Sequence, residues 1–106
     1  MPLTNIAPLQ SPITIAAATT ITPVNAGAYY DQTLVWSSAQ TLTINSGLPN
    51  GWRCRCRPPA SGNASIASDG TVLLNTATTT VTRALSSNIM FSIIQIGADS
   101  YAVSGS

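Results

Sequence analysis

The chain has 106 residues and carries four arginines and three aspartates, with no lysine, glutamate or histidine. This length suits a single domain and is too short for two independent cores. Without histidine, the chain has no Ser-His or Cys-His nucleophile, no imidazole metal ligand and no side chain with a near-neutral pKa. We therefore expect a non-enzymatic protein that holds neither a metal ion nor another cofactor.

Composition favours strands over helices. Thr, Ser and Ala dominate the chain, and the surface helix formers Glu and Lys are absent. Gly, Pro and Asn recur at short intervals and divide the chain into short pieces. No apolar run approaches the roughly 20 residues of a membrane-spanning helix. The N-terminal residues do not resemble a secretory signal, so we expect synthesis in a reducing cytoplasm.

The elements follow one another as an arm and a single β domain. Residues 1–12 contain three prolines and no periodic pattern, which predicts an extended arm. Residues 13–106 form the domain, and their first strand is predicted over 13–22. Residues 45–51 predict a loop. Further strands are predicted around residues 34–36, 41–44, 52–57, 64–67, 71–75, 80–85, 88–96 and 100–104. No fixed repeat is found, so the prediction is an all-β, compact sandwich or barrel-like module of about nine or ten short strands.

The strand at residues 52–57 has two faces of different chemistry, because side chains alternate across a sheet. One face carries Trp52, Cys54 and Cys56, and the other carries Arg53, Arg55 and Arg57. Cysteines two positions apart on one face do not favour a disulfide, and two thiols are at most half of a structural zinc site. Buried free thiols are the favoured interpretation, with a metal or redox role as the alternative.

Three of the four cations therefore share one strand, and their repulsion must be relieved by water, carboxylates or an anionic partner. A solvated stripe and a protein contact, with guanidinium groups on carboxylates or carbonyls, both remain open. A nucleic-acid partner is disfavoured, because the net charge is only +1 and no aromatic platform interleaves with the stripe.

The strand at residues 88–96 is apolar on both faces. Ile89, Phe91 and Ile93 lie on one face, and Met90, Ile94 and Ile96 lie on the other. One core covers one face, so the second must meet the opposite sheet, a loop or another subunit. Arg83 shares a face with Val81, as at a strand edge near an interface. We predict a subunit interface that includes Ile89, Met90, Phe91, Ile94, Ile96 and Arg83.

Two weaker signals concern single side chains. Asp69 and Asp99 adjoin turn residues, where an Asx-type turn explains them without catalysis. The aromatic residues Tyr29, Tyr30, Tyr101 and Trp36 are either core and hairpin residues or a sugar-binding surface.

Several turn and strand segments occur in an order that resembles the small β-modules of tailed-bacteriophage virions. The segments are Asn25-Ala26-Gly27, Leu42-Thr43-Ile44, Leu48-Pro49-Asn50-Gly51-Trp52, Asp69-Gly70-Thr71-Val72-Leu73-Leu74 and residues 93–105. Modules of this kind occur in head decoration proteins and tail fibres, commonly as trimers.

The resemblance implies a structural virion protein made in the host cytoplasm. The chain shows neither heptads nor repeats for a fibre shaft, which favours a capsid decoration or cement protein. It would form a homotrimer on the phage head and bind the major capsid protein, without a small-molecule substrate or a membrane. Arg53, Arg55, Arg57, Ile13 and Ile15 are the predicted capsid contacts. The alternative is a tail-fibre or tail-tip module that recognises host glycans.

Overall fold

A computed structural model describes residues 12–84 and 90–104 of the chain. The all-β prediction is confirmed: the described residues form ten strands in two sheets and one short helix. The predicted arm, apart from Pro12, and the predicted interface residue Ile89 lie outside the described residues.

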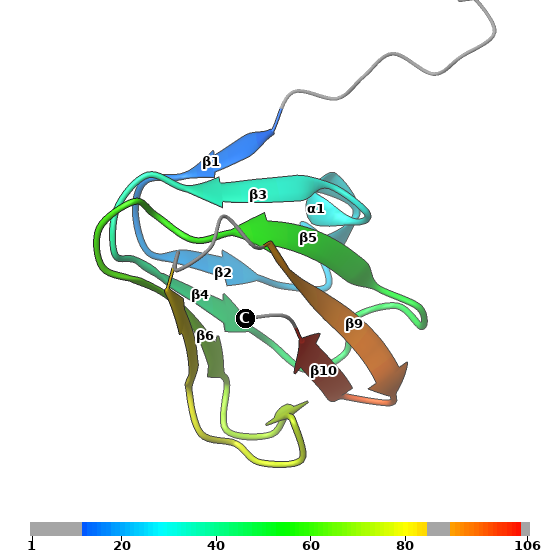
Figure 1. Cartoon of the computed structure of the whole chain (residues 1–106). Coiled ribbons are helices and arrows are strands. Elements are labelled where there is room, and N and C mark those ends of the chain that lie inside the picture. The colour runs from blue at the N-terminus through cyan, green and yellow to red at the C-terminus, as the bar shows by residue number, and fades with distance from the viewer. Residues whose placement is uncertain (1–11, 85–89, 105–106) are drawn as a thin grey trace, which may run out of the picture.

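Residues 13–68 wind through three successive coils, each of which gives one strand to each sheet (Figure 1). The strands of the larger sheet are β1 (Ile13–Ile15), β3 (Thr33–Trp36) and β5 (Arg53–Arg57). Those of the smaller sheet are β2 (Thr19–Ile21), β4 (Thr41–Ile44) and β6 (Asn63–Ser68). All neighbouring strands among these six pair in parallel, as stacked coils require.

The coils make the molecule a solenoid-like stack, so the predicted sandwich or barrel is wrong. In the larger sheet Ile13 pairs with Leu34 and Leu34 with Cys56, steps of 21 and 22 positions. In the smaller sheet Thr19 pairs with Leu42 and Leu42 with Ile66, steps of 23 and 24 positions. The structural repeat is therefore real but uneven, and a search for a fixed sequence period does not detect it.

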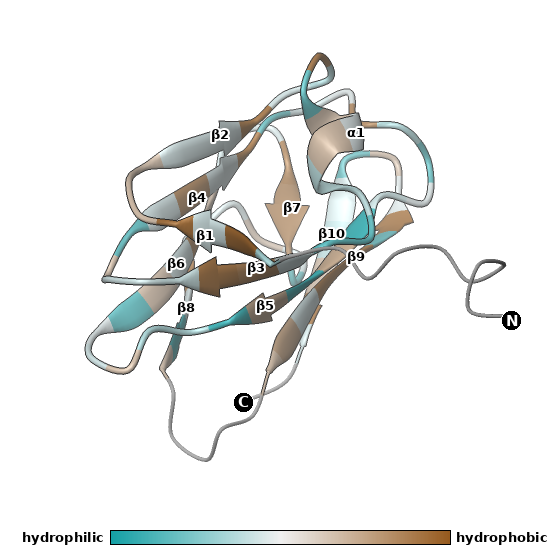
Figure 2. Ribbon diagram, turned by 90° about the horizontal axis from the view of Figure 1, so that it is seen from above, coloured by the Kyte–Doolittle hydropathy of each residue, from teal (hydrophilic) through white to brown (hydrophobic). Residues whose placement is uncertain are grey.

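The four strands that follow β6 close one end of the stack, and their pairing is mainly antiparallel (Figure 2). In the smaller sheet, β8 (Val81–Ala84) pairs antiparallel with β6. In the larger sheet, β9 (Phe91–Gly97) pairs antiparallel with β5 and with β10 (Ser100–Ser104), and β7 (Leu73–Leu74) lies parallel to β10. The strand orders are β1-β3-β5-β9-β10-β7 and β2-β4-β6-β8.

The core lies between the two sheets and is entirely apolar among the described residues. Trp36 packs against Phe91 with ring centroids 6.0 Å apart, and Trp52 meets Tyr101 edge to face at 6.3 Å. These rings join coil strands to the antiparallel end, because Phe91 and Tyr101 belong to β9 and β10. The coils and the antiparallel end thus share one core.

Two local features differ from the sequence predictions. The single strand predicted over residues 13–22 is two strands, β1 and β2, which belong to different sheets and meet at an exposed corner of three alanines. The helix α1 (Ala26–Tyr29) occupies the region of the predicted turn. Asn25 precedes it and exchanges hydrogen bonds with Thr22: Thr22 N donates to Asn25 Oδ1 at 2.7 Å, and Asn25 N donates to Thr22 Oγ1. Local polar contacts thus close a turn that periodicity does not reveal.

Candidate functional site: the outer face of the larger sheet

The arginines of β5 lie on the outer face of the larger sheet, as the alternation predicts. Arg53 and Arg55 expose 55% and 52% of their side chains, and Arg57 is half-buried. Cys54 and Cys56 between them point inward and are fully buried. The strand therefore has a buried face that carries the thiols and a solvent-facing side that carries the arginines.

One carboxylate partly neutralises this cationic face. Asp31 Oδ1 lies 3.3 Å from both Arg53 Nε and Arg55 Nη1, and Arg55 Nη2 also donates to the Asp31 carbonyl at 3.0 Å. Asp31 holds a left-handed backbone conformation (φ +57°), and its N–H donates to the carbonyl of Arg53 at 2.6 Å. Three arginines facing one aspartate leave the face with a net positive charge.

Exposed isoleucines adjoin the arginines across the pairing of β5 with β9. Arg53 lies opposite Ile94, and Arg55 lies opposite Ser92. Ile94 and Ile96 are 42% and 62% exposed on this outer face, and Figure 2 shows the hydrophobic colour of β9 beside the mixed colouring of β5. A hollow of about 330 Å³ lies among Arg53, Cys54, Arg55, Ser92 and Ile94.

This combination of groups suits contact with another protein surface. Each guanidinium has five donors in a fixed fork, and the Asp31 contacts show that carboxylate and carbonyl oxygens both reach them. The neighbouring isoleucines would remove apolar area from water when covered.

Two predicted contact residues are buried in the core, and a third is partly buried against it. Ile15 and Phe91 are each 1% exposed, and Ile13 is half-buried and packs against the core. The side chains of Ile15 and Phe91 fill the space between the sheets, so neither is available in this fold for the predicted capsid or subunit contact, whereas Ile13 is only partly buried and stays a predicted capsid contact. Met90, which precedes β9, is 39% exposed and stays a candidate with Ile94 and Ile96.

Arg83 also faces inward. It is two positions from Val81, which packs against the core, and its Nη2 donates to the carbonyl of Val103 at 2.9 Å. Its Nη1 donates to the carbonyl of Thr82 at 2.9 Å, while its buried Nε has no partner in the described part of the chain. Arg83 therefore bridges β8 of the smaller sheet to β10 of the larger one, and its place in a subunit interface stays a prediction.

The two cysteines are free thiols, as predicted. Their Sγ atoms lie 3.7 Å apart, and burial, with a smaller contribution from Cys54, raises the pKa of Cys56 well above its ordinary value. A protonated buried thiol is a poor nucleophile and a poor metal ligand. Within residues 12–84 and 90–104, no three Cys, Asp, Glu or His side chains gather as a metal site would need.

The other two aspartates anchor the loop at residues 45–51. Asp69 makes the predicted Asx-type turn, with its Oδ1 accepting from Thr71 N at 2.9 Å, and its Oδ2 accepts from Ser46 N at 2.8 Å. These backbone donors lower the pKa of Asp69 below its ordinary value. Asp99 Oδ1 accepts from Gly47 N at 2.8 Å. Both carboxylates therefore have structural partners on this loop.

The aromatic residues do not form one surface. Trp36 and Tyr101 are buried in the core, while Tyr30 is 46% exposed. Burial, followed by the nearby Asp99 carboxylate, raises the pKa of Tyr101 to about 12. The predicted set of Tyr29, Tyr30, Tyr101 and Trp36 is therefore dispersed, with core packing accounting for Trp36 and Tyr101.

Sequence reasoning missed Asp31 as a member of the site. It lies 22 positions before Arg53, which is one coil of the stack, and only the winding of the chain brings the two together. The scarcity of acidic residues was the one available signal, since Asp31 is one of three.

Comparison with known proteins does not assign the chain to a family. No protein-family model matches the chain, and no curated protein matches it. Among the described residues, none of the helices has the length and apolar character needed to cross a membrane.

Proposed function

We propose that the chain is a structural, non-enzymatic protein of a bacteriophage virion, a decoration or cement protein that binds the head as a homotrimer. The observation that carries the proposal is the outer face of the larger sheet, where exposed arginines and exposed isoleucines stand side by side. The resemblance of the turn and strand order to phage modules supplies the biological setting.

The two kinds of side chain have separate roles in this proposal. Ile94, Ile96 and Met90 pack against another copy of the chain, because their burial removes apolar surface from water. Arg53, Arg55 and Arg57 reach carboxylates and carbonyls of the major capsid protein. Each contact is modest, and a trimer multiplies it through effective concentration on a symmetric shell.

A tail-fibre or tail-tip module is the second candidate. It is favoured by a pocket that the partly exposed Tyr30 lines and that shares no lining residue with the arginines and isoleucines of the outer face. Nucleic acid is not proposed as a partner, since Asp31 already occupies two of the three arginines of β5.

The test combines the native mass with binding to purified heads that lack this protein. The variant Arg53→Ser/Arg55→Ser/Arg57→Ser is expected to lose head binding while its unfolding midpoint changes little, because Arg53 and Arg55 are about half exposed and Arg57 is partly exposed. A matched control on the smaller sheet, Thr20→Ser/Thr43→Ser/Thr82→Ser, is expected to bind like the wild type. Unchanged occupancy of the arginine variant, or a native mass of one chain, would overturn the proposal.

A further inference from the structure

A small pocket lies between α1 and the loop that precedes β5. Its volume is about 300 Å³, and its lining residues are Gly27, Tyr30, Pro49, Asn50 and Trp52. The size is at the lower end for ligand sites, which suits a single ring and excludes an extended ligand.

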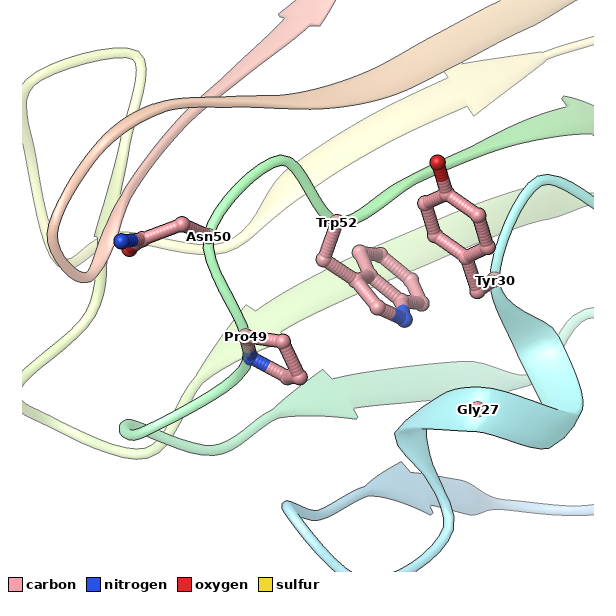
Figure 3. Close-up of a pocket in the computed structure, with 5 residues that line it drawn as sticks. All are labelled: Gly27, Tyr30, Pro49, Asn50 and Trp52. Atoms are coloured by element: carbon pink, nitrogen blue, oxygen red, sulfur yellow. The ribbon is translucent and has the colours of Figure 1, made fainter.

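The wall of the pocket is formed by rings. Figure 3 shows the indole of Trp52 between Pro49 and the phenol ring of Tyr30, with the amide of Asn50 pointing away from them. Trp52 is 1% exposed and its Nε1 donates to the carbonyl of Ala26 at 2.9 Å, so it is fixed in place. Tyr30 is 46% exposed and offers its ring to solvent.

The loop side of the pocket is also held firmly. Gln95 Oε1 accepts from Gly51 N at 2.5 Å and from Trp52 N at 3.3 Å. Asp69 and Asp99 hold the same loop through Ser46 and Gly47. A pocket with a fixed wall loses little entropy when a ligand enters.

We propose that this pocket binds one neutral hexopyranose ring. No charged side chain lines the pocket, which argues against a phosphate, a carboxylate or an amine. A pyranose has an apolar C–H face that can cover the rings of Tyr30 and Pro49, while its hydroxyl groups stay in water at the open side. The inference is independent of capsid binding, and it gives the tail alternative a specific site.

Binding to one such pocket is weak, with a Kd in the millimolar range, because the ligand stays half-solvated and meets few polar groups. Several copies presented together would raise the strength of attachment to a glycan-bearing surface. The pocket is therefore useful to a protein that is displayed in many copies.

The test uses the two tryptophans as internal reporters. In a ¹⁵N NMR titration of the full chain with methyl glucoside, galactoside and mannoside, the Trp52 indole N–H signal should shift and saturate. The Trp36 indole, which donates to the carbonyl of Gln40 at 2.9 Å, should not move. Tyr30→Ala should weaken binding about tenfold, and Tyr30→Phe should retain it because the ring face remains.

Gly27 provides a way to fill the pocket without breaking the fold. A Cβ at Gly27 meets no atom within 4 Å, so Gly27→Leu places its side chain in open space. Ala28→Leu adds the same side chain to the next position of α1, an exposed residue outside the pocket lining. Gly27→Leu should abolish the Trp52 shift, and Ala28→Leu should leave it unchanged.

Three results would overturn the inference. They are a Trp52 signal that no glycoside moves, equal binding by Gly27→Leu and Ala28→Leu, and a shift produced only by a peptide with the sequence of residues 1–12. The last result would make the pocket a peptide site. None of them depends on phage heads, so failure here is distinguishable from failure of the capsid proposal.

Discussion

The two faces of the larger sheet carry the same kind of residue in opposite surroundings. On β9, Ile93 is completely buried, whereas Ile94, the next residue, is 42% exposed and Ile96 is 62% exposed. The inward side chains fill the space between the sheets, and the outward side chains of Ile94 and Ile96 are exposed to solvent on the same face as the arginines. Hydrophobicity alone therefore does not distinguish a residue of the core from a residue of the outer face.

The outer face of the smaller sheet makes the contrast sharper. The outward positions of its central strands hold short, neutral residues: Thr41, Thr43, Ser65 and Ala67. Thr20 and Thr82 extend the same rows onto β2 and β8. A face of this kind needs no partner, so the chemistry that favours association is concentrated on one side of the stack.

The largest expected effect comes from the inner face. Phe91→Ala removes a ring that packs on Trp36 and should lower the free energy of unfolding by about 3–5 kcal/mol. Ile96→Ala, on the outer face of the same strand, should change it by less than about 0.5 kcal/mol when both variants are measured as dissociated chains. Urea denaturation followed by tryptophan fluorescence measures both. Equal losses in the two variants would mean that the faces do not differ as described.

Periodicity predicted the strands well because each is set by local alternation. The two faces of β5, the buried thiols of Cys54 and Cys56 and the loop at residues 45–51 all follow from neighbouring residues. The stacking of coils does not follow, because it depends on residues 21–24 positions apart and the step changes from coil to coil.

The corners between the strands explain why the number of residues per coil varies and why the sequence shows no fixed repeat. The first corner is three alanines, and the third contains Gly62 in a left-handed conformation (φ +90°). A Cβ on Gly62 would lie 2.8 Å from the Cβ of Ala39 in the corner of the previous coil. Such close approach needs glycine at one position only, so it leaves no repeated signature in the sequence.

The sequence predicted only part of the candidate site, because alternation along a strand is local and contacts between distant segments are not. Alternation placed the arginines on one face and marked β9 as apolar on both sides, but it could not say which side lay outward. Phe91 and Ile94 were therefore assigned to the same interface, although only Ile94 is exposed. The contact of Arg83 with the Val103 carbonyl could not be predicted, because that carbonyl lies 20 positions away on the other sheet.

The proposed association of chains depends on the outer face of the larger sheet. Ile94→Ser/Ile96→Ser should convert the proposed trimer into single chains at the same concentration, and should change the stability of the dissociated chain by no more than about 1 kcal/mol. Light scattering coupled to size exclusion measures the mass. The matched control Thr43→Ser/Thr82→Ser, on the outer face of the smaller sheet, should keep the wild-type mass. A serine variant that still forms trimers would place the subunit contact elsewhere.

The smallest expected effect isolates the charge on the outer face. Asp31→Asn keeps the shape of the side chain, and asparagine tolerates the left-handed conformation at this position. It removes the negative charge shared by Arg53 and Arg55, so unfolding at low salt should become easier by up to about 1 kcal/mol. Because all three groups are substantially exposed, the difference should shrink as added salt screens them. A loss that is the same at low and high salt would show that the Asp31 carboxylate acts through its hydrogen bonds to Arg53 and Arg55, and that its charge does not stabilise the arginines of β5.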